Sequence, residues 1–137
     1  MKLCSACLLG IDCRYNQKGK PNDKIIQMAK DELLIPVCPE QLGGLATPRA
    51  VAEIKDGRVI NQDGKDVTAE FRQGAGEVLK IAKFYDIRGA ILKQKSPSCG
   101  CGKIYDGTFS GVVIEGDGLT TKLLKENGIK VETEDDL

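Results

Sequence analysis

The stretch Arg88-Gly89-Ala90-Ile91-Leu92-Lys93 is predicted to form a strand, and it comes directly after a long helical pattern. We expect that helix to begin at Thr68 and to continue to Asp86. Its apolar stripe consists of Phe71, Ala75, Val78, Leu79, Ala82, Phe84 and Tyr85. A helix that leads into a short apolar strand is typical of α/β proteins.

The same alternation continues on both sides of this unit. Toward the N-terminus we expect a strand over residues 3–9, a helix over 22–33 and a strand over 34–38. Toward the C-terminus we expect a helix over 119–128 and a strand over 129–132. Residues 51–60 resemble a satellite β-hairpin turning at Asp56-Gly57, and residues 96–118 form a Gly-rich segment. The pattern predicts a three-layer, Rossmann-like α/β domain with a small parallel or mostly parallel sheet.

Length and charge narrow the class of protein further. The 137 residues suit one domain spanning residues 1–137. Equal numbers of acidic and basic residues give no global basic field that would attract nucleic acid, and the few aromatic residues leave few platforms for stacking bases. No apolar run approaches the roughly 18 residues of a membrane span. We therefore expect a cytoplasmic protein with a small-molecule substrate and no membrane partner, and the sequence is compatible with a homodimer.

Six cysteines and no histidine define the chemistry that is available. Without imidazole there is no Ser-His-Asp or Cys-His machinery and no mixed cysteine-histidine zinc finger. The N-terminus shows no signal-peptide pattern, so we expect a reducing compartment in which disulfides are rare. Two explanations of the cysteines remain: an all-thiolate metal site, or side chains that only pack in the core.

Three of the cysteines stand at or just past the ends of predicted strands, namely Cys7, Cys38 and Cys99. Ligands of open α/β sheets bind at that edge, which favours a shared thiolate site over packing. Cys4, inside the first strand, is better explained by packing, and Cys13 and Cys101 by positions near the site. The spacings Cys4-x-x-Cys7 and Cys99-x-Cys101 are compatible with a four-thiolate zinc site. The alternative is a 4Fe-4S cluster that is held by three cysteines and has one iron without a protein ligand.

Several motifs resemble, in order, the thiouracil desulfidase-like family of small bacterial proteins. They are Cys7-Leu8-Leu9-Gly10, Cys13-Arg14-Tyr15-Asn16, Pro36-Val37-Cys38-Pro39-Glu40, Gly43-Gly44-Leu45, Thr47-Pro48-Arg49, Asp66-Val67-Thr68, Lys95-Ser96-Pro97-Ser98-Cys99-Gly100, Ile104-Tyr105-Asp106-Gly107-Thr108-Phe109 and Gly128-Ile129. The resemblance implies a 4Fe-4S cluster held by Cys7, Cys38 and Cys99, and an enzyme that removes sulfur from thiolated nucleobases.

Desulfuration also needs a group that handles protons and groups that hold the substrate. Without histidine, a carboxylate is expected to move protons, and Glu40 follows Cys38 in a proline-fixed turn. The resemblance implies Glu40 and Ser96 as the catalytic pair, with Ser98 as a competitor for the serine role. We expect Arg14, Tyr15 and Arg49 to orient a planar heterocycle, although Arg49 could instead pair with Glu53.

The hypothesis is therefore desulfuration of a heterocycle such as 2-thiouracil by an iron-sulfur enzyme, releasing sulfide. The alternative is a non-catalytic metal-binding or redox-sensing module that uses the same thiolates for a structural zinc or a closed iron-sulfur cluster. An open iron that substrate can reach separates the two, because a structural site would be closed by a fourth protein ligand.

Overall fold

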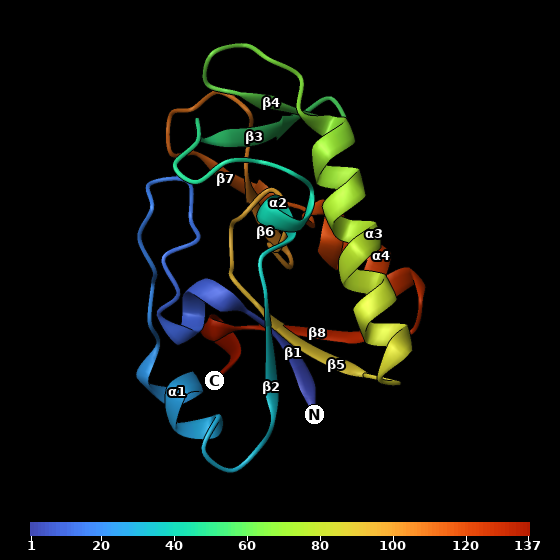
Figure 1. Cartoon of the computed structure of the whole chain (residues 1–137). Coiled ribbons are helices and arrows are strands. Elements are labelled where there is room, and N and C mark those ends of the chain that lie inside the picture. Colours follow the sequence, from blue (N-terminus) through green and yellow to red (C-terminus); the bar gives the residue numbers. More distant parts are fainter.

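A four-stranded parallel sheet forms the centre of the protein in the computed structural model, which describes all 137 residues. The strand order is β2-β1-β5-β8, and each neighbouring pair is parallel. The strands are β1 (Lys2–Ser5), β2 (Leu34–Val37), β5 (Gly89–Leu92) and β8 (Lys130–Thr133). The predicted α/β fold with a parallel sheet is confirmed (Figure 1).

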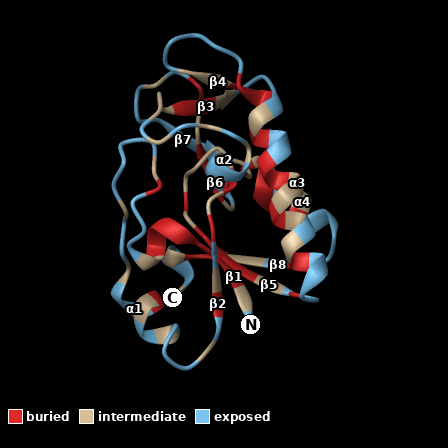
Figure 2. Ribbon diagram, viewed as in Figure 1, coloured by how far each residue is buried: buried red, intermediate tan, exposed pale blue.

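Helices cover both faces of the sheet because the side chains of its strands alternate between them. On one face, Leu3 of β1 joins a buried apolar cluster with α3 (Thr68–Phe84) and α4 (Leu119–Glu126). On the other face, Cys4 joins a second cluster with α1 (Asp23–Met28). The buried residues accordingly follow the sheet and the inner sides of the helices, which gives three layers (Figure 2).

The sheet has a switch point between its two central strands. From β1 the chain moves outward to β2, and it later returns to the other side of β1 to form β5. Connections that leave in opposite directions open a crevice at the carboxyl ends of such strands, where ligands of α/β proteins bind. The residues that follow β1, β2 and β5 are thus the ones that build a site.

The first predicted strand is wrong beyond Ser5. Residues Ala6–Leu9 form a 3₁₀ helix, η1, instead of continuing the strand. Gly10 ends this turn with a φ of 94°, and its N–H is directed at the carbonyl oxygens of Ala6 and Cys7. The apolar run therefore bends over the sheet edge and carries Cys7 with it.

Two helix predictions also need correction. Asn22 caps α1 as expected, since its side chain accepts the N–H of Ile25, but the helix ends at Met28 and Leu33 is 65% exposed. Helix α3 ends at Phe84, and Phe84 and Tyr85 are exposed rather than part of its buried stripe. Their two rings form an edge-to-face contact on the surface, with centroids 5.0 Å apart.

Two small hairpins lie apart from the main sheet. The predicted hairpin is confirmed as β3 (Ala52–Lys55) and β4 (Arg58–Asn61). The second hairpin, β6 (Lys103–Tyr105) and β7 (Val113–Glu115), was not predicted within the Gly-rich segment. All three residues of β7 are exposed, so this strand lacks the alternating burial that sequence patterns detect.

A one-turn helix, α2 (Pro39–Leu42), follows β2 and was also not predicted. It packs against α3 and carries the residues directly after Cys38. Pro39 at its first position fits the start of a helix, because the missing N–H would have had no intrahelical partner.

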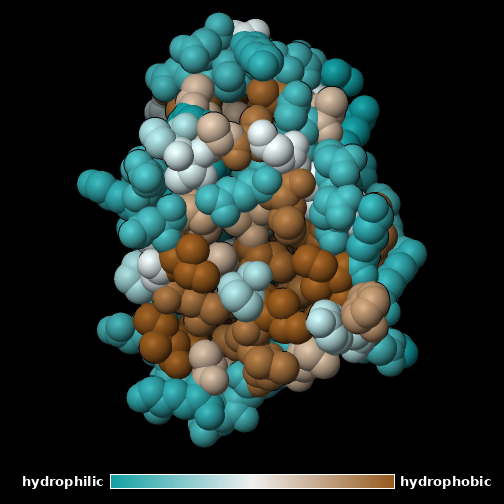
Figure 3. Space-filling model, in the orientation of Figure 1, coloured by the Kyte–Doolittle hydropathy of each residue, from teal (hydrophilic) through white to brown (hydrophobic).

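Figure 3 shows the face of the protein on which the edge strand β2 lies in front. This face has a hydrophilic part and a more apolar part. Apolar side chains gather over this edge, whereas the region of the β3–β4 hairpin is hydrophilic. Pro36 lies exposed in β2 and offers no N–H to another strand. None of the helices combines the length and the apolar character that crossing a membrane would need.

Candidate functional site

A pocket of about 140 Å³ opens at the carboxyl ends of β1, β2 and β5. It contains all of the predicted site residues except Ser98, and these are Cys7, Arg14, Tyr15, Cys38, Glu40, Arg49, Ser96 and Cys99. They come from the loops after three different strands. The fold therefore brings together residues that are far apart in the sequence, at the switch point of the sheet.

Each of the three predicted ligand cysteines reaches the pocket from a tight turn. Cys7 lies in η1, and its carbonyl accepts the N–H of Lys20 at 2.8 Å. Cys38 is the residue before α2 and is only partly buried. Cys99 is buried, and its carbonyl oxygen accepts the hydroxyl of Thr121 at 2.8 Å. These backbone contacts fix where each thiol can point.

Cys13 adds a fourth thiol to the pocket wall. Cys13 lines the pocket together with Cys7 and Cys38, and the Cys38 Sγ donates to the backbone carbonyl oxygen of Cys13 at 3.7 Å. The neighbouring Cys38 thiol lowers the pKa of Cys13, whereas Cys7 and burial raise it, and the net result is a pKa of about 11. Cys13, together with burial, raises the pKa of Cys38. Binding a metal here must therefore displace thiol protons.

The donor set fits an iron-sulfur cluster better than a single ion. No three cysteine, aspartate or glutamate side chains lie close enough together to hold one metal ion. The three predicted ligand thiols instead stand around one pocket, all six cysteines are free of disulfides, and no histidine is present. Thiolates spread around a cavity are the donors that Fe–S clusters use.

The two remaining cysteines lie outside the pocket. Cys4 is fully buried in the cluster beneath α1, as expected for a packing residue. Burial, with a smaller contribution from Cys99, raises the pKa of Cys4 to about 12. Cys101 is partly buried, and its sulfur lies 3.8 Å from the carbonyl oxygen of Val131.

Glu40 is held by Arg49 rather than free in the pocket. The Arg49 Nε atom donates to Glu40 Oε1 at 3.0 Å, and the two side chains are 7% and 19% exposed. The remaining Arg49 donors bond to the carbonyls of Cys13 and Ala46 and to the hydroxyl of Thr47. Arg49 thus ties the loop of Cys13 and its own loop, with Ala46 and Thr47, to the carboxylate.

Glu53, the other partner considered for Arg49, has a different role. It is buried, and its Oε1 atom accepts the N–H groups of Gly107 at 3.0 Å and Phe109 at 3.1 Å. It therefore closes the turn after β6 instead of pairing with Arg49.

The two serines of the Ser-Pro-Ser-Cys segment face different ways. Ser96 lines the pocket, and its Oγ accepts the N–H groups of Ser98 at 3.1 Å and Cys99 at 3.0 Å. Its hydroxyl proton remains available to a ligand. Ser98 is buried outside the pocket wall, with its Oγ 3.0 Å from Thr120 Oγ1 on α4.

Arg14 and Tyr15 lie at the rim of the pocket. The guanidinium carbon of Arg14 is 5.6 Å from the centroid of the Tyr15 ring, within the range of a cation–π contact. The Tyr15 carbonyl accepts the N–H of Arg49 at 2.9 Å, which joins this rim to the network around Glu40. A planar ring could be held here by stacking and by charge-assisted hydrogen bonds.

Several pocket residues were missed from the sequence. Ser5 lines it at the end of β1, Lys93, Gln94 and Lys95 line it directly after β5, and Tyr105 reaches it from the unpredicted hairpin. The signal for Lys93, Gln94 and Lys95 was their place at the carboxyl end of the predicted strand 88–93, whereas Ser5 lay inside the predicted strand 3–9. Lys95 also has a φ of 68°, a left-handed conformation that is uncommon outside glycine.

Gln94 and Lys93 stabilise the loop that carries Ser96 and Cys99. The Gln94 amide accepts the N–H of Cys101 and donates to its carbonyl, both at 2.8 Å. Lys93 forms a half-buried ion pair with Glu134, with a distance of 2.9 Å between Nζ and Oε2. The loop is therefore held at its base by side chains as well as by its turns.

Comparison with known proteins agrees with this architecture. Residues 3–136 match the model of the 2-thiouracil desulfurase family, and the chain belongs to that family. It is 42% identical over 147 residues to the uncharacterized protein YbbK of Bacillus subtilis (strain 168), covering 100% of this chain and 97% of that protein. A solved structure, the 4Fe-4S-dependent thiouracil desulfidase TudS, superposes with a TM-score of 0.94. The two chains are 43% identical, and the match covers 99% of this chain and 91% of TudS.

Proposed function

We propose that this chain is a 4Fe-4S-dependent desulfidase that replaces the thiocarbonyl sulfur of a small heterocycle such as 2-thiouracil by oxygen. The reaction consumes water and releases hydrogen sulfide, so it needs no oxidant or reductant. The observation that carries the proposal is the meeting of Cys7, Cys38 and Cys99 in one pocket with Glu40 and Ser96. Membership of the 2-thiouracil desulfurase family and the similarity to TudS support it.

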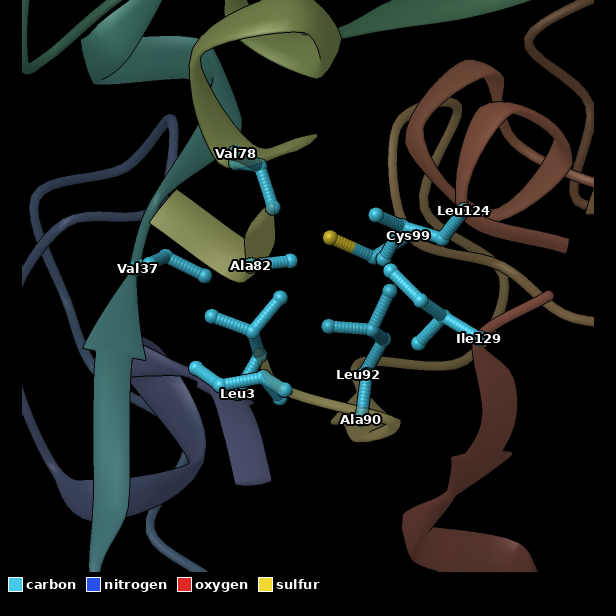
Figure 4. Close-up of a cluster of buried hydrophobic side chains, with 10 residues drawn as sticks. Leu3, Val37, Val78, Ala82, Ala90, Leu92, Cys99, Leu124 and Ile129 are labelled. Carbon is cyan, nitrogen blue, oxygen red and sulfur yellow. The ribbon is translucent and has the colours of Figure 1, made fainter. Parts of the chain in front are cut away.

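Cys7, Cys38 and Cys99 would hold the cluster. A 4Fe-4S cluster bound by three thiolates supplies one open iron, a soft Lewis acid that prefers a thiocarbonyl sulfur to water or a carbonyl oxygen. Cys99 reaches the pocket from the apolar cluster on the α3 and α4 side (Figure 4). Cys38 is partly exposed, whereas Cys7 and Cys99 are buried.

Glu40 is the group that moves protons in this proposal. Its carboxylate would take a proton from the attacking water and return one to a ring nitrogen of the product. Arg49 keeps that carboxylate at the pocket wall through the 3.0 Å contact between Nε and Oε1. Arg49 is engaged with Glu40 and three other groups. We therefore assign Arg49 the role of positioning Glu40, rather than that of binding the substrate.

Ser96 is the better of the two serine candidates. Its oxygen already accepts two backbone N–H groups, which fixes the oxygen and leaves the proton to donate to the substrate or to water. Those N–H groups also stabilise negative charge on the oxygen if the hydroxyl acts as a base or nucleophile. Ser98 is engaged with Thr120 away from the pocket and is not retained as a substrate contact.

A flat, weakly polar substrate fits the rest of the wall. Val37, Pro39, Val51 and Ala52 give the pocket apolar surface beside the polar groups. Tyr15 offers a ring for stacking, and Arg14 offers a cation for a ring oxygen or nitrogen. This combination suits a pyrimidine-sized ring with one soft and several hard polar atoms.

The rival is a closed four-thiolate site without turnover, and one observation favours it. Cys13 lines the same pocket as Cys7 and Cys38, so it could supply a fourth ligand. A closed site would bind its metal without responding to 2-thiouracil, whereas an open site would respond spectroscopically.

Turnover of 2-thiouracil by the anaerobically loaded protein tests the proposal. We expect sulfide release together with loss of the thiocarbonyl absorbance, and loss of both activity and cluster colour in Cys38→Ala. Cys101→Ser is the matched control, because Cys101 lies outside the pocket, and it should keep both. Turnover in a colourless Cys38→Ala protein would contradict the proposal.

A further inference from the structure

The proposed chemistry leaves the departing sulfur atom without a partner from the protein. The oxygen of water replaces the sulfur, and the C–S bond breaks with its electron pair on the sulfur, which leaves as hydrogen sulfide with two protons. Glu40 and Ser96 serve the water and the ring. A charge that builds up in an enclosed pocket is best stabilised by a fixed donor with a positive charge. A cation held at the pocket wall is therefore the group to look for.

Lys93 is the pocket cation whose charged group is held in place and still has a donor to spare. Arg49 is engaged with Glu40, and Arg14 lies over the ring of Tyr15 at the rim. Lys93 directly follows β5 and lines the same pocket as the three predicted ligand cysteines.

Two contacts fix the Lys93 ammonium group. Its Nζ atom lies 2.9 Å from Glu134 Oε2 and donates to the carbonyl oxygen of Gln94 at 3.0 Å. The side chains of Lys93 and Glu134 are only 20% and 14% exposed. An ammonium group has three N–H donors, so one of them remains for a group that enters the pocket.

Glu134 holds this ammonium from outside the pocket. It is the first residue of the 3₁₀ helix η2 (Glu134–Asp136), which follows β8. Its Oε1 atom accepts the backbone N–H of Gln94 at 2.7 Å, while its Oε2 atom contacts Lys93. The carboxylate is thus anchored to the backbone next to Lys93, which fixes its position relative to the ammonium group.

We propose that Lys93 is a further catalytic residue, whose third N–H donates a hydrogen bond to the sulfur atom as the C–S bond breaks, and that Glu134 is its positioning residue. The inference rests on the proposed function, because it requires the substrate sulfur to enter this pocket. Lys93 keeps its proton throughout, so the step needs no oxidant or reductant. The same hydrogen bond holds the hydrosulfide anion before it leaves.

The first test compares Lys93→Met with Lys93→Arg and with Lys95→Met, which removes a second lysine of the same pocket. The readouts are kcat and KM for 2-thiouracil and, independently of turnover, the affinity of the anaerobically loaded protein for sodium sulfide, followed by its visible spectrum. In Lys93→Met we expect kcat to fall by roughly 10²–10³-fold, as when an oxyanion-hole donor is removed, with a smaller change in KM. Sulfide should bind about tenfold more weakly, since a hydrogen bond to a charged group is lost.

Lys93→Arg should recover part of both losses, because arginine keeps the positive charge and N–H donors. Lys95→Met should lose less than Lys93→Met. Equal losses in these two variants would show that the total charge of the pocket matters rather than a placed donor, and would overturn the inference.

The second test changes Glu134 and covers a Lys93→Met protein that fails to fold. Glu134→Gln keeps an acceptor for the N–H of Gln94 but loses the charge that holds Lys93, so kcat should fall, though less than in Lys93→Met. Asp117→Asn is the matched control. Asp117 accepts the N–H of Gly102 at 2.8 Å and pairs with Lys125 at 3.0 Å, outside the pocket. This control should behave as wild type, and a wild-type kcat in Glu134→Gln would overturn the role of Glu134 and Lys93.

The outcomes separate this inference from the proposed function. Wild-type kcat and sulfide affinity in Lys93→Met would overturn the inference and leave desulfuration intact. Loaded wild-type protein that releases no sulfide from 2-thiouracil would overturn the proposed function, and the inference with it.

Discussion

Gly43, at the end of α2, and Gly74, within α3, face each other where the two helices meet. A Cβ atom on Gly74 would lie 1.8 Å from the carbonyl oxygen of Pro39, and one on Gly43 would lie 2.0 Å from the carbonyl oxygen of Glu70. Real Cβ atoms essentially never come so close to another heavy atom, so this crossing admits only glycine. It sets the position of the turn that carries Cys38 and Glu40.

Gly74→Ala should therefore destabilise the protein and disturb the site. We expect a loss of about 1–3 kcal/mol in the free energy of unfolding, as for overpacked interiors. Gly76→Ala is the control, since a Cβ there meets nothing within 4 Å in the same helix. It should stabilise the protein by about 0.5–1 kcal/mol, because alanine favours helix. Urea denaturation of the three proteins measures both effects, and equal stabilities would contradict the close crossing.

Arg49→Met should cost stability and activity together. The change leaves the half-buried Glu40 carboxylate without its cation and removes the bonds to Cys13, Ala46 and Thr47. We expect roughly 2–3 kcal/mol of destabilisation, as for other charged hydrogen-bonded groups that lose a partner. Arg58→Met breaks the exposed pair with Asp66 and should cost at most about 1 kcal/mol. The arrangement around Glu40 would be wrong if the two variants were equally stable.

Glu40→Gln should keep the cluster and lose turnover. The amide preserves the size of the side chain but cannot accept and return a proton, so kcat should fall by roughly 10²–10⁴-fold. The visible spectrum should stay unchanged, because Glu40 is not a proposed ligand. Glu77→Gln, on the exposed side of α3 beside Lys80, should behave as wild type. Normal turnover by Glu40→Gln would remove this residue from the mechanism.

Asp66 makes stability depend on pH in the acidic range. Hydrogen bonds from the side chain and backbone of Thr68, followed by the contact with Arg58, lower the pKa of Asp66 to about 2. The folded pKa is depressed, so the stabilisation is present above the unfolded pKa of about 3.9 and is lost as the pH falls toward 2.

Comparison of wild type with Asp66→Asn isolates this contribution. The variant should be less stable at pH 7, and the difference should shrink as the pH falls from about 4 to 2. Thermal unfolding followed by circular dichroism at several pH values measures it. A difference that stays constant over this range would exclude the depressed pKa as its cause.

The strands of the main sheet and the helices α3 and α4 were predicted because each has a strong local pattern. The parallel strands are short apolar runs, and α3 has an apolar stripe with buried Phe71 and Val78. The end of the first strand at Ser5 was not predicted, because the residues of η1 are as apolar as a strand. The left-handed Gly10 closes this turn, with its N–H directed at the carbonyls of Ala6 and Cys7.

The cysteines of the site could be grouped from the sequence because each lies at or just past the end of a predicted strand. The hydrogen-bond partners of the other site residues could not be predicted, because these bonds join loops that are distant in the sequence. Arg49 bonds to Glu40 rather than to Glu53, and Ser98 turns toward Thr120 on α4. Tyr105 enters the pocket from a hairpin whose exposed strand has no periodic pattern. These placements follow from tertiary packing, which local patterns do not encode.

The most direct test of the account is the metal and sulfide content of the protein purified without oxygen, measured together with its visible spectrum before and after 2-thiouracil is added. The account predicts about four iron and four sulfide per chain, and a broad absorbance that changes when the thiocarbonyl compound binds. About one zinc per chain, or an iron-sulfur spectrum that 2-thiouracil leaves unchanged, would contradict it.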